Sequence, residues 1–477
     1  LGHECPAFKN CFVYKARQAA LDAKIIVINH HLLLSDWGLK DENDEAKLLP
    51  DGVNLILDEA HQLSNIASLH FGRTVSTRKI KDLLQDVSIE YRSTAKDIKQ
   101  FANIPLAINR LLDQLQSYLL SKPDRGFYNA LYQEQIFKED LDNLNNLLKD
   151  LCDVLEANSN RSKGLENCYN RIGSLLLDLE HFILTSGSAR AEDNKTIKWY
   201  EVFKQNFMLK HSPLEVSDLF YEKLMAASRA CVLTSATLSV GGDFSLIKKN
   251  LGLHDAETIM IPSPFDYQNK SVLYVPRNMP DPMADHYIDA YVKNVLPVLE
   301  ASQGRAFLLF TSFNNMHKVY EQFKNNKIDQ EYNILMQGNA SKSSLLEQFS
   351  SIEKSVLLAT ASFWEGIDVK GPDLHCVVID KLPFTSPTEP LLQARIKHLQ
   401  EQGANAFLEL QCQEAALQLT QGAGRLIRSE SDYGVLMICD PRIISRQYGE
   451  LFLKALPPMR RTRDLGVIKD FYEQLPA

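Results

Sequence analysis

The chain has 477 residues, of which 45% are hydrophobic and 23% charged, as in ordinary globular proteins. This length allows about two to four domains, and no apolar run approaches the roughly 18 residues that a membrane span needs. The net charge of −8 excludes a surface coated with basic charge, although a local basic groove could still bind nucleic acid. Eight cysteines without dense spacing exclude a disulfide scaffold and indicate a reducing cytosol.

The first chemical pattern is a pair of cysteines near the start of the chain. Cys5 and Cys11 have C-x₅-C spacing and precede a predicted helix that carries Lys15 and Arg17. Taken alone, two such thiols fit a structural role as well as a ligating one. The next pattern, Asn29-His30-His31, follows a predicted strand at Lys24–Asn29. Two adjacent histidines rarely make a metal site alone, so these can be a simple strand-end pair.

A second apolar strand, predicted at Val53–Leu57, ends in Asp58-Glu59-Ala60-His61. A buried strand that delivers two carboxylates at its end is typical of the Walker B element of nucleotide-hydrolysing motors. The first acid can hold Mg²⁺ through a water, and the second can polarise the attacking water. A surface turn with two acids is the alternative interpretation of so short a motif.

Residues 76–222 contain few glycines and prolines, and leucines recur there at helical spacing. Two stripes predict the core of a helical bundle. They comprise Leu141, Leu144, Leu147, Leu148, Leu151 and Leu155, and Ile172, Leu175, Leu176, Leu179, Phe182 and Ile183. Polar loops are predicted at Ser159–Lys163 and Thr185–Lys195.

From about residue 229, short apolar runs alternate with helical stretches, which favours parallel sheets covered on both faces. The predicted strands are Ala230–Thr234, Val272–Val275, Ala306–Phe310, Val356–Ala359, Cys376–Ile379 and Val435–Ile438. The sequence therefore predicts an α/β fold with a large helical insertion between residues 61 and 230.

Polar residues follow two of these strands, where α/β sheets place ligand-binding loops. Ser235-Ala236-Thr237 can connect a phosphate site to a neighbouring domain through hydrogen bonds, or can be an ordinary turn. The strand at Ser355–Thr360 leads into Ser362, Trp364, Gly366 and Asp368. A glycine beside acids lets the backbone approach a phosphate or a nucleic-acid strand. Trp364 could stack on a base, although a core position is the alternative.

The segment from Gln421 to Arg428 reads Gln-Gly-Ala-Gly-Arg-Leu-Ile-Arg. Arg425 and Arg428 are three residues apart and share one face if the segment is helical. Guanidinium groups there can reach a γ-phosphate across a domain cleft, and an arginine finger raises the hydrolysis rate by about 10³- to 10⁵-fold. Two ordinary surface arginines are the alternative.

Four of these elements resemble motifs II, III, V and VI of superfamily 2 helicases, in the same order. They are Asp58–His61, Ser235–Thr237, the segment from Ser362 to Asp368 and the segment from Gln421 to Arg428. Leu426-Ile427 stands where DEAH RNA helicases typically have Ala-Gly, and roughly 170 residues separate the Asp-Glu-Ala-His and Ser-Ala-Thr elements. That insertion resembles the arch of the XPD/DinG family of DNA helicases. Asn29-His30-His31-Leu32-Leu33 is also similar to that family. The resemblance covers essentially the whole chain.

The resemblance implies two RecA-like parallel-sheet motor domains, the first incomplete, with a helical arch and the remnant of an iron–sulfur domain. The implied boundaries are residues 1–20 for the iron–sulfur part, 21–75 and 223–265 for the first motor domain, 76–222 for the arch, and 266–477 for the second motor domain. Cys5 and Cys11 would be two of the four ligands of a [4Fe–4S] cluster.

The resemblance also implies residue roles. Asp58 would position Mg²⁺ and Glu59 would activate water, within a catalytic set completed by His61, Gln421, Arg425 and Arg428. Nucleotide-binding roles are implied for Ser235, Thr237, Gly366, Asp368 and Gly424. Contacts with DNA are implied for Thr311, Ser312, Ser362 and Trp364. The expected reaction is ATP-dependent 5′→3′ movement on single-stranded or forked DNA, in repair or replication restart, by a monomeric bacterial cytoplasmic protein without membrane contact. Members of this family also suggest the clamp-loader-associated chi subunit of the replicative polymerase as a partner.

One departure from the family pattern is serious. No G-x-x-x-x-G-K-[ST] sequence occurs in the chain, and that loop cradles the phosphates. We therefore expect this chain to be a C-terminal portion of a longer protein, without ATPase activity or a complete cluster of its own.

Two other functions fit these residues less well. A non-enzymatic module for binding single-stranded DNA or a partner has no chemical use for Glu59 together with Arg425 and Arg428. An RNA helicase is disfavoured by Leu426-Ile427 in the last motif and by the pair Cys5 and Cys11.

Overall fold

The computed structural model describes residues 8–42, 49–50, 53–184, 195–360, 363 and 373–474 of the chain. It divides into two compact units, each formed from several chain segments. The first unit comprises Leu1–Thr234, Lys249–His254 and Ser386–Ala404. The second comprises Ser235–Lys248, Asp255–Thr385 and Asn405–Ala477.

The first unit contains a two-stranded parallel sheet, in which β1 (Val53–Leu57) pairs with β6 (Ser228–Leu233). β1 and the last four residues of β6 are mostly apolar, a composition that strands favour. The neighbouring elements are η2 (Phe8–Asn10), α1 (Phe12–Asp22), α2 (His30–Glu42), η3 (Ala60–Gln62), α3 (Leu63–His70) and α9 (Ser217–Ala227). The strands predicted at 53–57 and 230–234 are confirmed, with ends shifted by one or two residues in the second.

The strand predicted at Lys24–Asn29 is wrong. These residues are irregular, and the side chains of Ile25 and Val27 are 84% and 93% exposed. A strand needs a neighbour that accepts and donates its backbone hydrogen bonds. In the part of the chain that the structure describes, no strand lies beside this segment.

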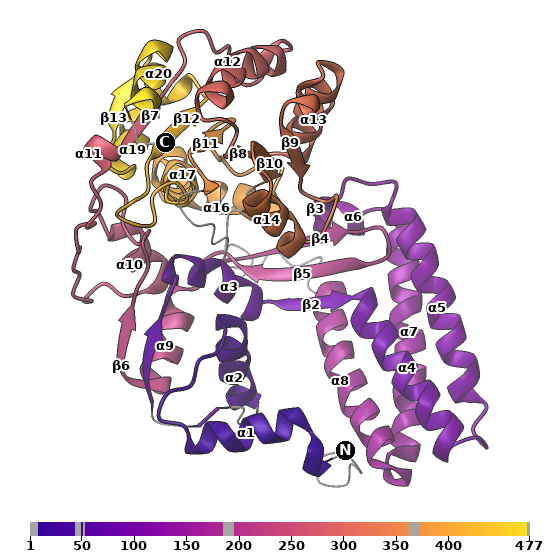
Figure 1. The fold of residues 1–477 in the computed structure, drawn as a ribbon. Helices are drawn as coiled ribbons and strands as arrows, with labels where there is room; N and C mark the ends of the chain where they lie inside the picture. The colour runs from indigo at the N-terminus through magenta and orange to yellow at the C-terminus, as the bar shows by residue number, and fades with distance from the viewer. Residues whose placement is uncertain are drawn as a thin grey trace. The chain divides into compact units, whose positions relative to one another are not determined.

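Four long helices form a bundle in the first unit (Figure 1). They are α4 (Thr77–Thr94), α5 (Gln100–Leu119), α7 (Gln135–Asn158) and α8 (Lys163–Leu184). Both predicted leucine stripes point into one core, because Leu141, Leu148, Leu151 and Leu155 are fully buried, as are Ile172, Leu179 and Phe182. The helical bundle is therefore confirmed. The polar connection predicted at Ser159–Lys163 is confirmed, because α7 ends at Asn158 and α8 begins at Lys163, with a 3₁₀ turn, η4 (Ser159–Arg161), between them. Residues 185–194 of the other predicted loop lie outside the described residues.

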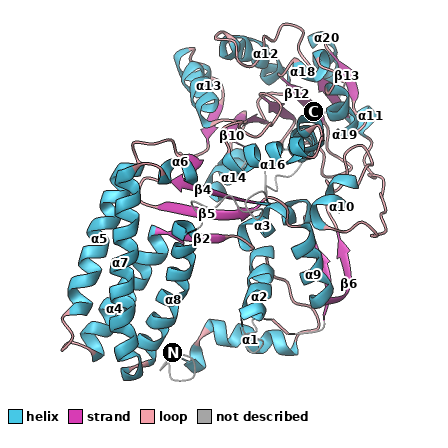
Figure 2. Ribbon diagram, turned by 180° about the vertical axis from the view of Figure 1, so that it is seen from behind, coloured by secondary structure: helices cyan, strands magenta, loops and turns pink. Residues whose placement is uncertain are grey.

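An antiparallel sheet crosses one end of this bundle, and sequence analysis did not predict it. Its order is β2-β5-β4-β3, and Figure 2 shows it beside the helices. The strands and their flanking helices are β2 (Arg73–Ser76), β3 (Arg125–Phe127), β4 (Thr196–Val202), β5 (Phe207–Pro213), α6 (Tyr128–Tyr132) and α16 (Pro390–Glu401). α16 packs through Leu391 and Ala394 on Ile197, Trp199 and Leu214. Its segment, Ser386–Ala404, thus belongs to the first unit although 266–477 was the expected second motor domain.

The second unit is built on a seven-stranded parallel sheet with the order β13-β7-β12-β11-β8-β10-β9. The strands are β7 (Ser271–Tyr274), β8 (Ala306–Phe310), β9 (Asn333–Met336), β10 (Ser355–Thr360), β11 (Cys376–Ile379), β12 (Gly434–Ile438) and β13 (Arg460–Thr462). The central strands are buried along their whole length, because helices cover both faces of the sheet. The four strands predicted between Val272 and Ile379 and the one at Val435–Ile438 are confirmed, and β9 and β13 were missed.

Alternate residues of each strand contribute to different cores. One face packs on α14 (Lys342–Ser351), α17 (Gln413–Ala423) and α19 (Gly449–Ala455), and the other on α12 (Tyr287–Ala301), α13 (Phe313–Asn325) and α20 (Leu465–Glu473). The remaining elements are α10 (Ser245–Leu251), α11 (Tyr267–Lys270), η7 (Ile328–Gln330), α18 (Arg442–Ser445) and a π-helix, η9 (Phe407–Cys412). Within the described ranges, none of the helices is both long enough and apolar enough to cross a bilayer.

Candidate nucleotide and nucleic-acid site

Asp58 and Glu59 follow β1 directly, and both are exposed. The ladder between β1 and β6 continues past the strands, since Thr234 N–H donates to the Leu57 carbonyl at 2.9 Å and Ala60 N–H donates to the Thr234 carbonyl at 3.1 Å. These bonds hold both ends of the acidic pair. Glu59 has φ 51° and ψ 41°, in the left-handed region that few residues other than glycine adopt. Such a conformation costs about 1–3 kcal/mol and clusters at functional sites.

His61 lies beside Glu59, with its Nδ1 3.3 Å from Glu59 Oε2. The His61 side chain is only 11% exposed, whereas that of Glu59 is 58% exposed. A fixed imidazole can therefore orient a carboxylate that remains open to solvent. The structure thus brings together three of the predicted catalytic residues, Asp58, Glu59 and His61.

Asn29, His30 and His31, at the start of α2, each make a different contact, and none of these contacts was predicted from the sequence. Asn29 caps the helix, because its Oδ1 accepts from Leu32 N–H at 2.8 Å. The His30 ring donates to the Asp58 carbonyl, and burial lowers the pKa of His30 despite that bond. His31 Nδ1 lies 3.0 Å from His70 Nε2, and burial followed by the His31 charge lowers the pKa of His70. Only the family resemblance had pointed to this segment.

Within the second unit, Thr237 lies between two predicted partners. Its N–H donates to Ser235 Oγ at 3.1 Å, and the two hydroxyl oxygens are 3.2 Å apart. Gln421 Nε2 donates to Thr237 Oγ1 at 3.4 Å. Thr237 is 3% exposed, so this contact fixes Ser235 and Gln421 relative to each other.

The arginines after Gln421 do not share a helical face. α17 ends at Ala423, and the residues from Arg425 to Arg428 form an irregular turn after Gly424. Asp432 stabilises this turn, because its Oδ2 accepts from the N–H groups of Arg428 and Ser429 at 2.7 and 2.8 Å. Both arginines remain half-buried. The turn, and not helical spacing, therefore determines where the two guanidinium groups point.

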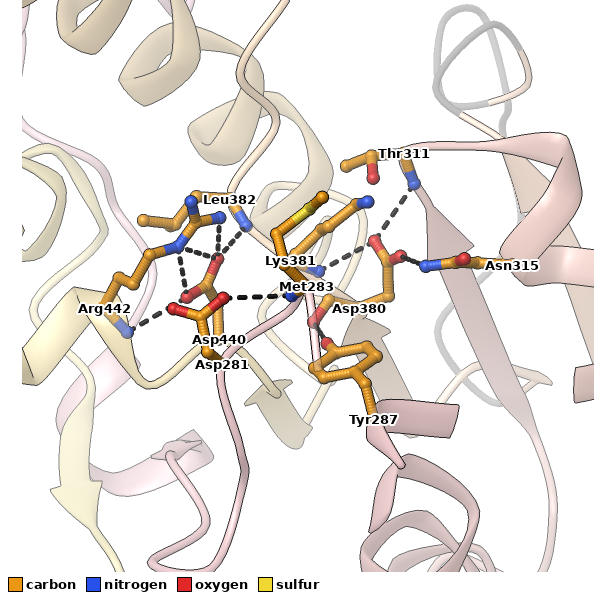
Figure 3. A network of polar contacts seen from close by, with 10 residues as sticks. All are labelled: Asp281, Met283, Tyr287, Thr311, Asn315, Asp380, Lys381, Leu382, Asp440 and Arg442. Atoms are coloured by element: carbon orange, nitrogen blue, oxygen red, sulfur yellow. Dashed lines mark hydrogen bonds and ion pairs between the residues drawn. The ribbon is translucent and has the colours of Figure 1, made fainter. Parts of the chain in front are cut away.

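Thr311 and Ser312 follow β8 and are tied into the fold. Thr311 N–H donates to Asp380 Oδ1 at 3.0 Å, and the Ser312 hydroxyl caps α13 by accepting from Asn315 N–H at 3.3 Å. Asp380 and Asp440, which follow β11 and β12, are both fully buried (Figure 3). Neither acid was among the predicted site residues, although each follows an apolar strand as Asp58 does.

Several predicted residues lie outside the described part of the chain, namely Cys5, Ser362, Trp364, Gly366 and Asp368. Cys11 is described, half-buried and not in a disulfide. No group of three or more histidine, cysteine, aspartate or glutamate side chains that could hold a metal occurs among the residues that the structure describes.

Similarity to known proteins shows the class of protein to which this fold belongs. Residues 295–459 match the helicase C-terminal domain family. An XPD helicase structure superposes with a TM-score of 0.55 over 89% of this chain and 71% of its own, at 16% identity. The parallel sheet of the second unit and this likeness confirm the predicted α/β fold with RecA-like helicase architecture.

The relatives then give the family. The ATP-dependent DNA helicase YoaA of Haemophilus influenzae is 39% identical over 99% of this chain and 72% of its own length. YoaA of Escherichia coli is 39% identical over 98% of this chain and 72% of its own length. The chain belongs to the family of YoaA and DinG helicases, which confirms the resemblance found in the sequence.

Proposed function

We propose that this chain forms most of an ATP-dependent DNA helicase that moves 5′→3′ along single-stranded or forked DNA. The two YoaA proteins that support this proposal are named as ATP-dependent DNA helicases, and the chain spans 72% of the length of each. The observation that carries the proposal is the exposed Glu59, which is held in a strained conformation beside His61 at the end of β1. A module that only binds DNA does not require such a group.

Asp58 and Glu59 fit a nucleotide–magnesium site because both are exposed carboxylates on a fixed turn, and Mg²⁺ prefers oxygen ligands. Mg²⁺ neutralises charge on the β- and γ-phosphates when it is bound. In this proposal Asp58 would hold the Mg²⁺ ion. Glu59 accepts a proton from the attacking water, and His61 keeps the Glu59 carboxylate oriented.

The second unit supplies the remaining proposed phosphate contacts. Gln421, Arg425 and Arg428 would bind the nucleotide phosphates, and Gly424 would let the backbone turn close to them. Ser235 and Thr237 would carry the state of the nucleotide to Gln421 through their hydroxyl contacts. The roles of Gly366 and Asp368 in sensing the nucleotide stay predictions. So do the DNA contacts of Thr311, Ser312, Ser362 and Trp364.

Cys5 and Cys11 are proposed as two of four ligands of a [4Fe–4S] cluster. The half-buried free thiol of Cys11 suits iron–sulfur ligation chemically. Iron and sulfide analysis of the full-length protein tests this, with the buried Cys412 as the matched control. We expect Cys11→Ser to lose the iron and Cys412→Ser to keep it. Iron retained by Cys11→Ser would contradict the assignment.

The test of the proposed function is DNA-stimulated ATP hydrolysis by the full-length protein. Glu59→Gln should reduce the rate by about 10²- to 10⁴-fold, the usual contribution of a general base. It should leave ATP binding intact, because Gln has the same size. Full activity in Glu59→Gln would refute the catalytic role, and DNA binding without hydrolysis in the unaltered chain would favour a binding module.

The same proposal covers the location, oligomeric state, pathway and protein partner. We place the protein in the bacterial cytoplasm, acting as a monomer in DNA repair or replication restart, and the chi subunit of the clamp loader is the proposed partner. Analytical ultracentrifugation of the purified chain, alone and with chi, measures both the monomeric state and the pairing.

A further inference from the structure

The carboxyl edge of the seven-stranded sheet places Thr311 beside Asp380. β8 and β11 are parallel neighbours, with Ile379 in register with Leu309, so their following residues meet at one edge. Asp380 Oδ1 accepts from Thr311 N–H at 3.0 Å and from Lys381 N–H at 2.7 Å. Asp380 Oδ2 accepts from Asn315 Nδ2 at 3.4 Å. One buried carboxylate therefore positions both loops.

The segment after Asp380 is held from its other side as well. The Tyr287 hydroxyl donates to the Asp380 carbonyl, and Leu382 N–H donates to Asp440 Oδ2 at 2.9 Å. Asp440 is in turn fixed by Arg442, whose Nη2 donates to Asp440 Oδ2 at 2.6 Å. Figure 3 shows these contacts converging on the two residues that flank Lys381. The backbone on both sides of Lys381 is therefore held by hydrogen bonds.

The polar groups of Thr311 and Ser312, two residues predicted to contact DNA, are bonded within the fold or buried. The N–H of Thr311 is bonded to Asp380, and its hydroxyl oxygen is buried without a partner among the described residues. The Ser312 hydroxyl caps α13. Lys381, in contrast, is partly exposed, and no acidic side chain in the described part of the chain forms a salt bridge with its ammonium group. Its side chain lies on the same side of Asp380 as Thr311 (Figure 3).

We propose that Lys381 binds a phosphate of the DNA strand, and that Asp380 is the positioning residue that presents Lys381 to it. This inference rests on the proposed helicase function and names a contact within it. The reasons are chemical. An ammonium group on a rigid backbone suits phosphate, which proteins bind mainly through lysine and arginine, and Asp380 holds the loop through the main chain.

The experiment measures the affinity of the full-length protein for a single-stranded oligonucleotide as a function of salt concentration. Each phosphate contact on a single strand adds about 0.7 to the slope of log K against log[salt]. Lys381→Ala should therefore lower the slope by about 0.7, and Lys381→Arg should keep it. Lys327 is the matched control, because it is exposed and follows α13 at the opposite edge of the sheet. Lys327→Ala should change nothing.

The positioning role is tested by a double-mutant cycle. Asp380→Asn should weaken strand binding when Lys381 is present, and should have no further effect in the Lys381→Ala background. Additive effects would overturn the positioning role, and an unchanged salt slope in Lys381→Ala would overturn the contact. A rise in the KM for ATP without DNA would instead assign Lys381 to the nucleotide and also overturn the contact.

The same data distinguish failure of this inference from failure of the proposed function. An unaltered chain that hydrolyses ATP and binds DNA, with an unchanged slope in Lys381→Ala, contradicts only the inference. An unaltered chain that neither hydrolyses ATP nor binds the oligonucleotide contradicts both. Circular dichroism of each variant shows that the fold is intact.

Discussion

The side-chain amide of Gln421 donates to the hydroxyl of Thr237 at 3.4 Å, although 184 residues separate the two in the chain. Both residues were selected from the sequence for separate reasons, and the structure of the second unit joins them. Their contact joins Thr237, which lies in the loop after β6, to the last turns of α17.

This contact predicts a measurable coupling energy. Thr237→Val and Gln421→Ala should each lower the free energy of unfolding of the second unit by about 0.5–1.5 kcal/mol, the usual net value of one hydrogen bond. The double variant should lose less than the sum, because both changes remove the same bond. Urea unfolding of the four proteins gives the coupling, and strict additivity would show that the contact contributes nothing.

Asp380 predicts a pH dependence of stability. Burial raises the pKa of Asp380 to about 6 from its ordinary value of 3.8, against the lowering effects of the Lys381 charge and the hydrogen bonds from Lys381, Thr311 and Asn315. The folded state therefore binds the proton more tightly than the unfolded state, and stability falls as pH rises from about 4 to 6. A shift of roughly two units corresponds to about 3 kcal/mol.

Asp380→Asn should remove that dependence. Thermal unfolding between pH 4.5 and 7 should show the melting temperature of the unaltered chain falling relative to that of Asp380→Asn as pH rises. Parallel curves for the two proteins would contradict the raised pKa. Asp464→Asn, at an exposed acid that caps α20, is a matched control and should follow the unaltered chain in this window.

Two leucines of α8 test the bundle core. Leu179 is fully buried, whereas Leu177 is 65% exposed on the same helix. Leu179→Ala should destabilise the first unit by about 2–5 kcal/mol through lost burial and the cavity left behind. Leu177→Ala should stay within about 0.5 kcal/mol. Denaturant unfolding followed by circular dichroism at 222 nm measures both, and equal losses would place the core elsewhere.

The strained backbone of Glu59 predicts opposite effects on stability and activity. Glu59→Gly should relieve the left-handed conformation and raise the free energy of unfolding by up to about 1 kcal/mol. The same change removes the carboxylate and should abolish ATP hydrolysis. Glu59→Gln is the matched control, because it loses activity and keeps the strain. A Gly variant less stable than the Gln variant would argue against strain at this position.

Arg125 predicts how firmly α16 is held. Its guanidinium contacts Glu201 through Nε at 2.9 Å and Glu389 through Nη1 at 2.7 Å. Burial raises the pKa of Glu201, but its bonds to Lys210 and Arg125 outweigh that effect and hold the pKa below its usual value. Arg125→Ala should therefore loosen Ser386–Ala404 and speed its cleavage by trypsin. Arg78→Ala, at an exposed i,i+4 pair with Asp82, should not.

The parallel strands of the second unit were predictable because each is a continuous apolar run, which burial on both faces requires. β13 could not be predicted in this way, because Arg460-Arg461-Thr462 contains no apolar residue and lies at the edge of the sheet. β4 carries lysine and glutamate between apolar residues, and that alternation was hidden inside a region interpreted as helical. The Gln421–Thr237 and Asp380–Thr311 contacts could not be predicted, because nothing local in either segment specifies a partner far away in the sequence.

The chain passes from one unit to the other at five points, after residues 234, 248, 254, 385 and 404. A protease that cuts any one of these connections leaves the two units covalently tethered by the remaining four. Neither unit can be expressed as one uninterrupted stretch of gene, and a frameshift after residue 385 would remove strands from the second unit together with α16 from the first. The two units are therefore encoded and synthesised only together, because each is formed from three interleaved segments of one chain.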